Sequence, residues 1–197
     1  MNIKVILLGL CVISALSVVL IPWSGTHRRN VVEQVAQLNG QWVGRKAPGF
    51  TLPDLQGKEH SLEDYRGKVV FLNFWASFCT PCKEEMPSME RLVRQYKDRG
   101  LVMIAVSFDP EAAASQAFMD QFLPGQRSAM TILHDPKSTT GQVYGTELIP
   151  ETYIIDQQGQ IVARFVNAYD WARPEVKGLI ESLLTDSGAS ALSKPLL

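Results

Sequence analysis

A pair of cysteines, placed between an apolar run and a charged one, constrains the fold most. The run "VVFLNFW" covers Val69 to Trp75, and Cys79 and Cys82 follow it closely in "ASFCTPCKEE". Because the run is short and rich in β-branched and aromatic residues, it predicts a strand buried on both faces. Helix formers then occupy residues 83–99 up to Gly100, and a second such strand is expected over 101–108. This order predicts a β-α-β unit with the cysteines where its helix begins.

That position predicts redox chemistry for the two cysteines. The free N–H groups and the dipole of a helix N-terminus stabilise a thiolate, which lowers the pKa of a cysteine placed there. We therefore expect Cys79 to attack disulfides and Cys82, in the first turn, to resolve the mixed disulfide. Pro81 suits that turn because a first-turn N–H is not needed. A zinc half-site and an inert core pair are the alternatives, but a structural zinc site needs four ligands and no histidine has ligand spacing.

The remaining chain predicts one α/β domain. The segments "TYIID" and "QIVARF", residues 152–165, are expected to form a hairpin that turns at "DQQG". Further helices are expected over residues 111–122, 138–144 and 174–184. The net charge is -1, with 19 Lys and Arg scattered among 20 Asp and Glu, so no basic face for nucleic acid is present. The methionines and aliphatic residues after Cys82, from Met86 to Val93, have the spacing of a core-facing helix stripe.

The N-terminus carries an uncharged apolar run over residues 5–21. A bilayer-spanning helix needs about 17 to 25 apolar residues, so this run predicts an uncleaved anchor in the lipid bilayer. A cleavable signal peptide is the alternative. Lys4 before the run and Arg28 and Arg29 after it slightly favour a cytoplasmic domain by the positive-inside rule. We expect the anchor over 1–23, a spacer over 24–43, the domain over 44–186 and a flexible tail over 187–197.

Three motifs together resemble one family. The segments "VVFLNFWASFCTPCKEEMPSM", "APGFTLPDLQGKEHSLEDYRGK" and "YGTELIPETYIIDQQGQIV" resemble the membrane-anchored thioredoxin-like reductases of the TlpA, ResA and CcmG type. The resemblance covers about residues 44–184. It implies a thioredoxin-like fold, with a central mixed sheet flanked by helices, on the outer side of the bacterial cytoplasmic membrane. It also implies dithiol-disulfide exchange without a cofactor, often in cytochrome c maturation, with disulfide-containing exported proteins as substrates and a membrane protein as electron donor.

The resemblance also assigns roles to single residues. Pro150 in "LIPETY" matches the cis-proline beside the redox cysteines. Ile149, just before it, offers backbone hydrogen bonds to an extended substrate. Glu85 matches an acidic residue that accepts the proton of the resolving thiol, while its neighbour Glu84 is the weaker candidate. The expected substrate contacts are Phe78, Thr80, Pro81, Ile149, Pro150 and Glu151.

Two positions depart from related patterns. Asn73 stands where cytoplasmic thioredoxins have an aspartate, so the base role moves to Glu85. Phe78 stands where a tryptophan usually precedes the first cysteine.

Three other activities fit parts of the sequence. An oxidant that makes disulfides is one alternative, because a thioredoxin-like fold acts in that direction when its thiolate is strongly stabilised. A metallochaperone would bind Cu(I) through the two thiolates and a third ligand such as His134. The opening of the domain also resembles peroxiredoxins, but these have a threonine where this chain has Ala76.

Overall fold

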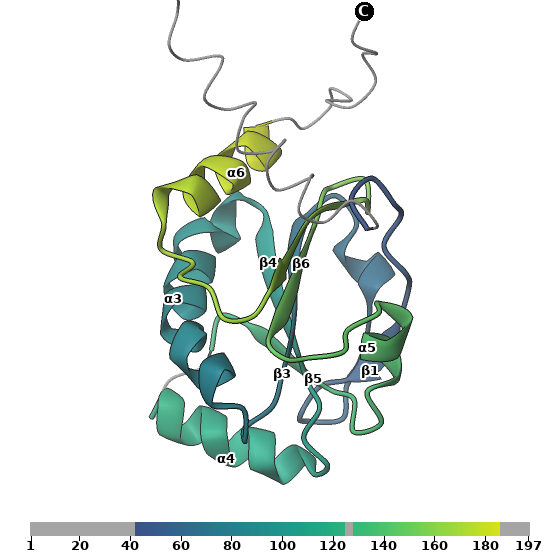
Figure 1. Ribbon diagram of the computed structural model, residues 1–197, viewed down its shortest axis with the longest axis vertical. Helices are drawn as coiled ribbons and strands as arrows, with labels where there is room; N and C mark the ends of the chain where they lie inside the picture. Colours follow the sequence, from purple (N-terminus) through teal and green to yellow (C-terminus); the bar gives the residue numbers. More distant parts are fainter. Residues whose placement is uncertain (1–41, 125–127, 186–197) are drawn as a thin grey trace, which may run out of the picture.

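The computed structural model describes residues 42–124 and 128–185. A five-stranded mixed sheet of order β5-β4-β3-β6-β7 forms its centre (Figure 1). Strand β3 (Val69–Trp75) pairs in parallel with β4 (Leu101–Ser107), and β4 pairs in parallel with β5 (Thr131–His134). On its other side β3 pairs antiparallel with β6 (Glu151–Ile155), which forms the predicted hairpin with β7 (Ile161–Val166). The predicted mixed sheet is confirmed.

Helices cover one face of this sheet. Helix α3 (Thr80–Tyr96) and α6 (Pro174–Thr185) lie on that face, and α4 (Ala112–Phe122) lies at one end (Figure 1). The 3-10 helix η2 (Lys97–Arg99) continues α3 to Gly100, whose φ of 104° ends it in a left-handed conformation. The predicted helix therefore begins three residues earlier than Lys83, because Cys79 is its N-cap.

Smaller elements cover the opposite face. A two-stranded antiparallel sheet of β1 (Thr51–Pro53) and β2 (Glu59–Ser61) precedes the 3-10 helix η1 (Leu62–Tyr65). Helix α5 (Thr139–Val143) lies on the same side (Figure 1). Trp42 packs against Tyr144 and Tyr153, with ring centroids 6.4 and 6.0 Å apart, so the folded unit reaches back at least to residue 42.

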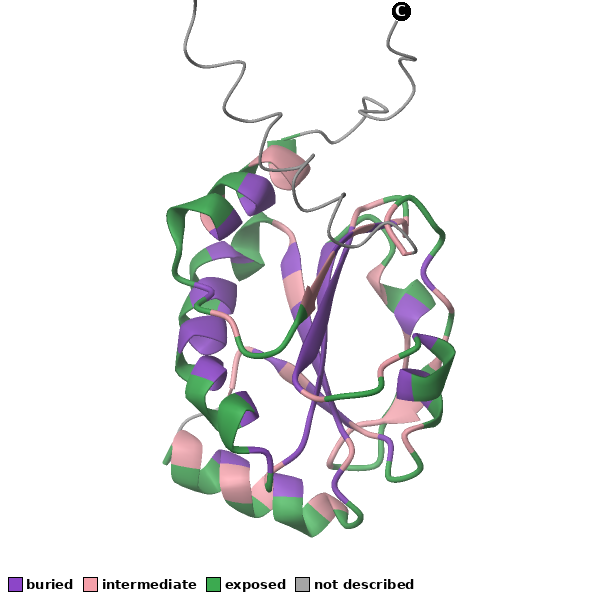
Figure 2. Cartoon of the chain, viewed as in Figure 1, coloured by how far each residue is buried: buried purple, intermediate pink, exposed green. Residues whose placement is uncertain are grey.

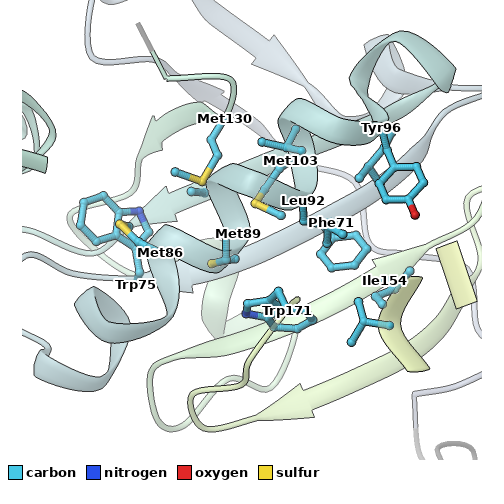
Figure 3. Packing of buried hydrophobic residues seen from close by; sticks show 14 of the residues in the cluster. Phe71, Trp75, Met86, Met89, Leu92, Tyr96, Met103, Met130, Ile154 and Trp171 are labelled. Carbon is cyan, nitrogen blue, oxygen red and sulfur yellow. The ribbon is translucent and has the colours of Figure 1, made fainter. Parts of the chain in front are cut away.

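Two hydrophobic clusters hold the layers to the sheet, and all residues of β3 are buried between them (Figure 2). The stripe Met86, Met89, Leu92 and Val93 of α3 is buried as predicted. It belongs to the same hydrophobic cluster as Phe71 and Trp75 of β3, of which Figure 3 labels ten residues. Burying a side chain of this size contributes about 1.5–3 kcal/mol. This packing fixes α3, and with it the cysteine pair, against the end of β3.

The predicted anchor, most of the spacer and the tail lie outside the described residues. None of the helices within residues 42–124 and 128–185 has the length and apolar character needed to cross a bilayer.

Candidate active site

The two cysteines form a disulfide at the N-terminus of α3. Cys79 has the extended backbone of an N-cap residue, and its Sγ accepts the backbone N–H of Cys82 at 3.2 Å. The exposed fraction is 8% for Cys79 and 0% for Cys82. The residues around the pair, Phe78, Thr80 and Pro81, are exposed. An incoming sulfur atom can therefore approach Cys79 but not Cys82.

The loop before β6 lies against this disulfide. The Ile149–Pro150 peptide bond is cis, as predicted, and the Ile149 carbonyl oxygen is 3.7 Å from Cys79 Sγ. The end of β7 supports the loop, because Asn167 N–H donates to the Pro150 carbonyl at 3.0 Å. The backbone at Ile149 thus lies next to the one sulfur that reaches the surface.

Glu85 is buried one turn along α3 from Cys82, with 3% of its surface exposed, whereas Glu84 is exposed. Residues three apart on a helix lie on the same side, which places Glu85 on the buried side with Cys82. Its Oε1 accepts from Asn73 Nδ2 at 3.0 Å, and its Oε2 accepts from Tyr169 N–H and Trp171 Nε1, each at 3.0 Å.

Burial decides the ionisation of Glu85. Removal of the carboxylate from water raises its pKa from 4.5 to about 7, and the three hydrogen bonds only partly oppose this. A carboxyl group with such a pKa exchanges protons near neutral pH, which suits a general acid or base. Asn73 completes the site by also donating to Thr152 Oγ1 at 2.9 Å.

Glu151 is placed differently from the other predicted site residues. It has 1% of its surface exposed and forms an ion pair with Arg164 of β7. Its side chain lies on the same face of the sheet as those of Phe74 and Tyr153. The side chain of the adjacent Thr152 lies on the other face, toward Asn73 and α3. The structure therefore brings Glu151 next to Pro150 in the chain but not to the exposed surface around Cys79.

A buried carboxyl group that the sequence analysis missed holds the loop before Cys79. Asp109 follows β4 and is fully buried. It accepts hydrogen bonds from the backbone N–H of Ser77 at 3.0 Å and the Ser77 hydroxyl at 2.8 Å. The hydroxyls of Ser107 and Ser115 also donate to it. Asp109 thus ties the end of β4 to Ser77, two positions before Cys79.

Replacing Asp109 with alanine is expected to lower the free energy of unfolding by about 2–4 kcal/mol, because the part-buried donors of Ser77 and the buried hydroxyls of Ser107 and Ser115 lose this acceptor. Urea unfolding of the oxidised protein measures this change. Asp120, exposed on α4, accepts a surface hydrogen bond from Gln116 and is the matched control. Its alanine variant is expected to change stability by less than about 0.5 kcal/mol. Equal stability of the two variants would contradict the assigned role of Asp109.

The residues on which the metallochaperone and peroxidase alternatives depend, His134 and Ala76, form no comparable site. His134 ends β5, and its Nε2 is 2.8 Å from the Asp109 carbonyl oxygen. Within the described parts of the chain, no three His, Cys, Asp or Glu side chains are placed to hold a metal ion. Ala76 is buried and offers no hydroxyl to a peroxide.

A sheet with this strand order, an N-terminal helix disulfide and a facing cis-proline define a thioredoxin-like site for thiol-disulfide exchange. The sequence profile of the AhpC/TSA family matches residues 43–164, and the chain belongs to this family. Thiol-disulfide oxidoreductase ResA of Bacillus thuringiensis is 33% identical over 141 residues, which cover 72% of this chain and 78% of the relative. Thioredoxin-like protein YneN of Bacillus subtilis is 41% identical over 118 residues, which cover 60% of this chain and 68% of the relative.

Solved structures agree with this assignment. The crystal structure of a Chlorobium tepidum protein assigned as thiol:disulfide interchange protein DsbE has a TM-score of 0.62 at 33% identity. It covers 74% of this chain and 96% of its own. The structure of a thiol-disulfide oxidoreductase from Bacteroides fragilis has a TM-score of 0.57 at 27% identity. The match covers 71% of this chain and 99% of that one. The protein is therefore a thiol-disulfide oxidoreductase of the ResA and DsbE type.

Proposed function

We propose that the protein is a membrane-tethered reductase of disulfides in exported proteins, with apocytochrome c as the substrate class that the family resemblance of the motifs implies. The apolar run over residues 5–21 would anchor it in the bacterial cytoplasmic membrane, with the domain on the extracytoplasmic side. One observation carries the activity: the Cys79–Cys82 disulfide lies beside the Ile149 backbone, with the buried Glu85 one turn behind Cys82.

The reductive cycle follows from this geometry. The Cys79 thiolate of the reduced protein attacks one sulfur of a substrate disulfide and forms a mixed disulfide, releasing the other substrate sulfur as a thiolate. Cys82 then transfers its thiol proton toward Glu85 and attacks Cys79 Sγ. This step releases the second substrate thiolate and forms the Cys79–Cys82 disulfide. Two electrons have passed to the substrate, and protons from Glu85 and from water complete its two thiols.

The surface around Cys79 suits an extended, apolar substrate segment. Phe78 and Leu148 flank the disulfide and the Ile149 backbone, with 67% and 69% of their surfaces exposed. Exposed apolar side chains of this size around one reactive atom mark an interaction site. We propose that they contact residues on either side of the substrate cysteine, while Ile149 and Pro150 pair with its backbone and Thr80 and Pro81 border the contact.

A separate protein must restore the dithiol. Within the described residues the two cysteines of the motif are the only ones, so the domain there holds no further thiol for an internal relay. We propose a membrane protein that passes electrons outward from the cytosol as the donor.

The reduction potential of the Cys79–Cys82 pair tests the direction of the reaction. Equilibrating the full-length protein with glutathione or dithiothreitol buffers is expected to give a potential near or below that of thioredoxin, about -270 mV. Because about 30 mV changes the two-electron equilibrium tenfold, a coarse value is sufficient. A potential near -120 mV, about that of a strong periplasmic oxidant, would mean that the protein makes disulfides.

A further inference from the structure

Trp171 makes a hydrogen bond to Glu85 that neither the motifs nor the proposed cycle assigns. The residue lies in the loop between β7 and α6, and its side chain is fully buried. Its indole Nε1 donates to Glu85 Oε2 at 3.0 Å, the same oxygen that accepts from Tyr169 N–H. The loop that contains Trp171, 86 residues after Glu85 in the chain, therefore supplies two of the three donors to this carboxyl group.

The indole is held in place from several sides. Its ring meets Phe71, Phe165 and Tyr169 edge to face, with centroids 5.3, 5.1 and 5.5 Å apart. Figure 3 shows Trp171 in the hydrophobic cluster beside Phe71 and Ile154. The Trp171 backbone N–H also donates to Ser88 Oγ of α3 at 3.2 Å. Turning the indole away from Glu85 would require opening this cluster, so its N–H is a fixed donor.

We propose that Trp171 is a positioning residue that favours the ionised form of the Glu85 carboxyl group and orients it toward the proton of Cys82. This inference rests on the proposed function, in which Glu85 accepts that proton. The three groups bonded to Glu85 all donate, an arrangement that stabilises the carboxylate and not the protonated acid. Trp171 thus offsets part of the cost of burying the charge.

Few charged groups surround Glu85, so burial sets the direction of its pKa shift and the three donors limit the size of that shift. The neighbours on β3 and β6 are the uncharged Asn73 and Thr152. From α3 the titratable neighbour is Cys82, and from the loop it is Tyr169. Asp170 and Arg173 of the same loop are exposed, and Arg173 lies over the Tyr169 ring. No charged side chain is hydrogen-bonded to Glu85 among the described residues.

The variant Trp171→Phe tests this role because it removes the N–H and keeps an aromatic ring. Losing one donor to a carboxylate is expected to make proton binding by Glu85 about tenfold tighter. The midpoint of the pH profile of disulfide exchange by the full-length protein should then move up by about one pH unit. The carboxyl carbon chemical shift of Glu85, measured by NMR in the oxidised protein, should titrate with the same displacement.

Trp75→Phe is the matched control. Trp75 is also fully buried and packs against Phe118, but its Nε1 has no hydrogen-bond partner among the described residues. We expect this variant to leave both midpoints where they are in the wild type.

Equal midpoints for Trp171→Phe and the wild type would overturn the inference, as would equal displacements in the two Trp→Phe variants. Glu85→Gln separates this failure from a failure of the proposed function. A Glu85→Gln variant with an unchanged profile would remove Glu85 from the cycle, whatever Trp171 does.

Discussion

Replacing Cys79 with serine is expected to abolish disulfide reduction by the protein, because it removes the sulfur of the redox pair that reaches the surface. Replacing Cys82 with serine should instead let the first exchange proceed and block resolution. The expected result is a mixed disulfide between Cys79 and the substrate, visible as a slower band on non-reducing gels. Insulin reduction measures the loss of activity in both variants.

The third cysteine of the chain provides the control for this experiment. Cys11 lies outside the described residues and outside the motif, so Cys11→Ser is expected to reduce insulin at the wild-type rate. The assigned roles would be reversed if Cys79→Ser accumulated mixed disulfides and Cys82→Ser did not.

Replacing Glu85 with glutamine is expected to change how stability depends on pH. The folded protein raises the pKa of Glu85 from 4.5 to about 7, so it favours the protonated form. The resulting stabilisation is complete below pH 4.5 and is lost as the pH rises through about 7. At about 1.4 kcal/mol per pH unit, this window corresponds to about 3 kcal/mol. Between pH 4 and pH 8, the oxidised wild type should lose about 3 kcal/mol more of its free energy of unfolding than the Gln variant.

The same variant should alter the rate profile. Resolution by Cys82 should accelerate in the wild type as Glu85 ionises near pH 7. In the variant it should accelerate only as the thiol itself ionises, near pH 8.5 for an ordinary cysteine. Urea unfolding at several pH values and stopped-flow exchange measure the two effects. Parallel stability curves would show that Glu85 titrates as in the unfolded chain.

Local patterns were sufficient to predict the centre of the fold. The apolar run of β3, the helix formers of α3 and the hairpin of β6 and β7 each carry their signal within a few residues. The choice of Glu85 over Glu84 came from the family resemblance, and the structure supplies its physical reason. Glu85 is three residues from the buried Cys82 and adjacent to the buried Met86, so it lies on the same side of the helix.

Contacts between distant segments explain what the sequence did not predict. Trp171 and Asp109 look like an aromatic residue before a helix and an acid after a strand, which are common. Their roles depend on Glu85 and Ser77, 86 and 32 residues away. Glu151 illustrates the opposite problem. It follows Pro150 directly, but the alternation of the strand turns Thr152 toward α3 and Glu151 toward Arg164.

The unequal exposure of the two sulfurs also limits the order of events in turnover. With Cys82 fully enclosed, the oxidised protein can be attacked only at Cys79, the same atom that attacks the substrate in the reduced protein. The proposed donor and the substrate would therefore use the same opening, bordered by Phe78 and the Ile149 loop, one after the other. We expect ping-pong kinetics without a ternary complex. The two partners would then compete for one surface, and an excess of either would slow the half-reaction of the other.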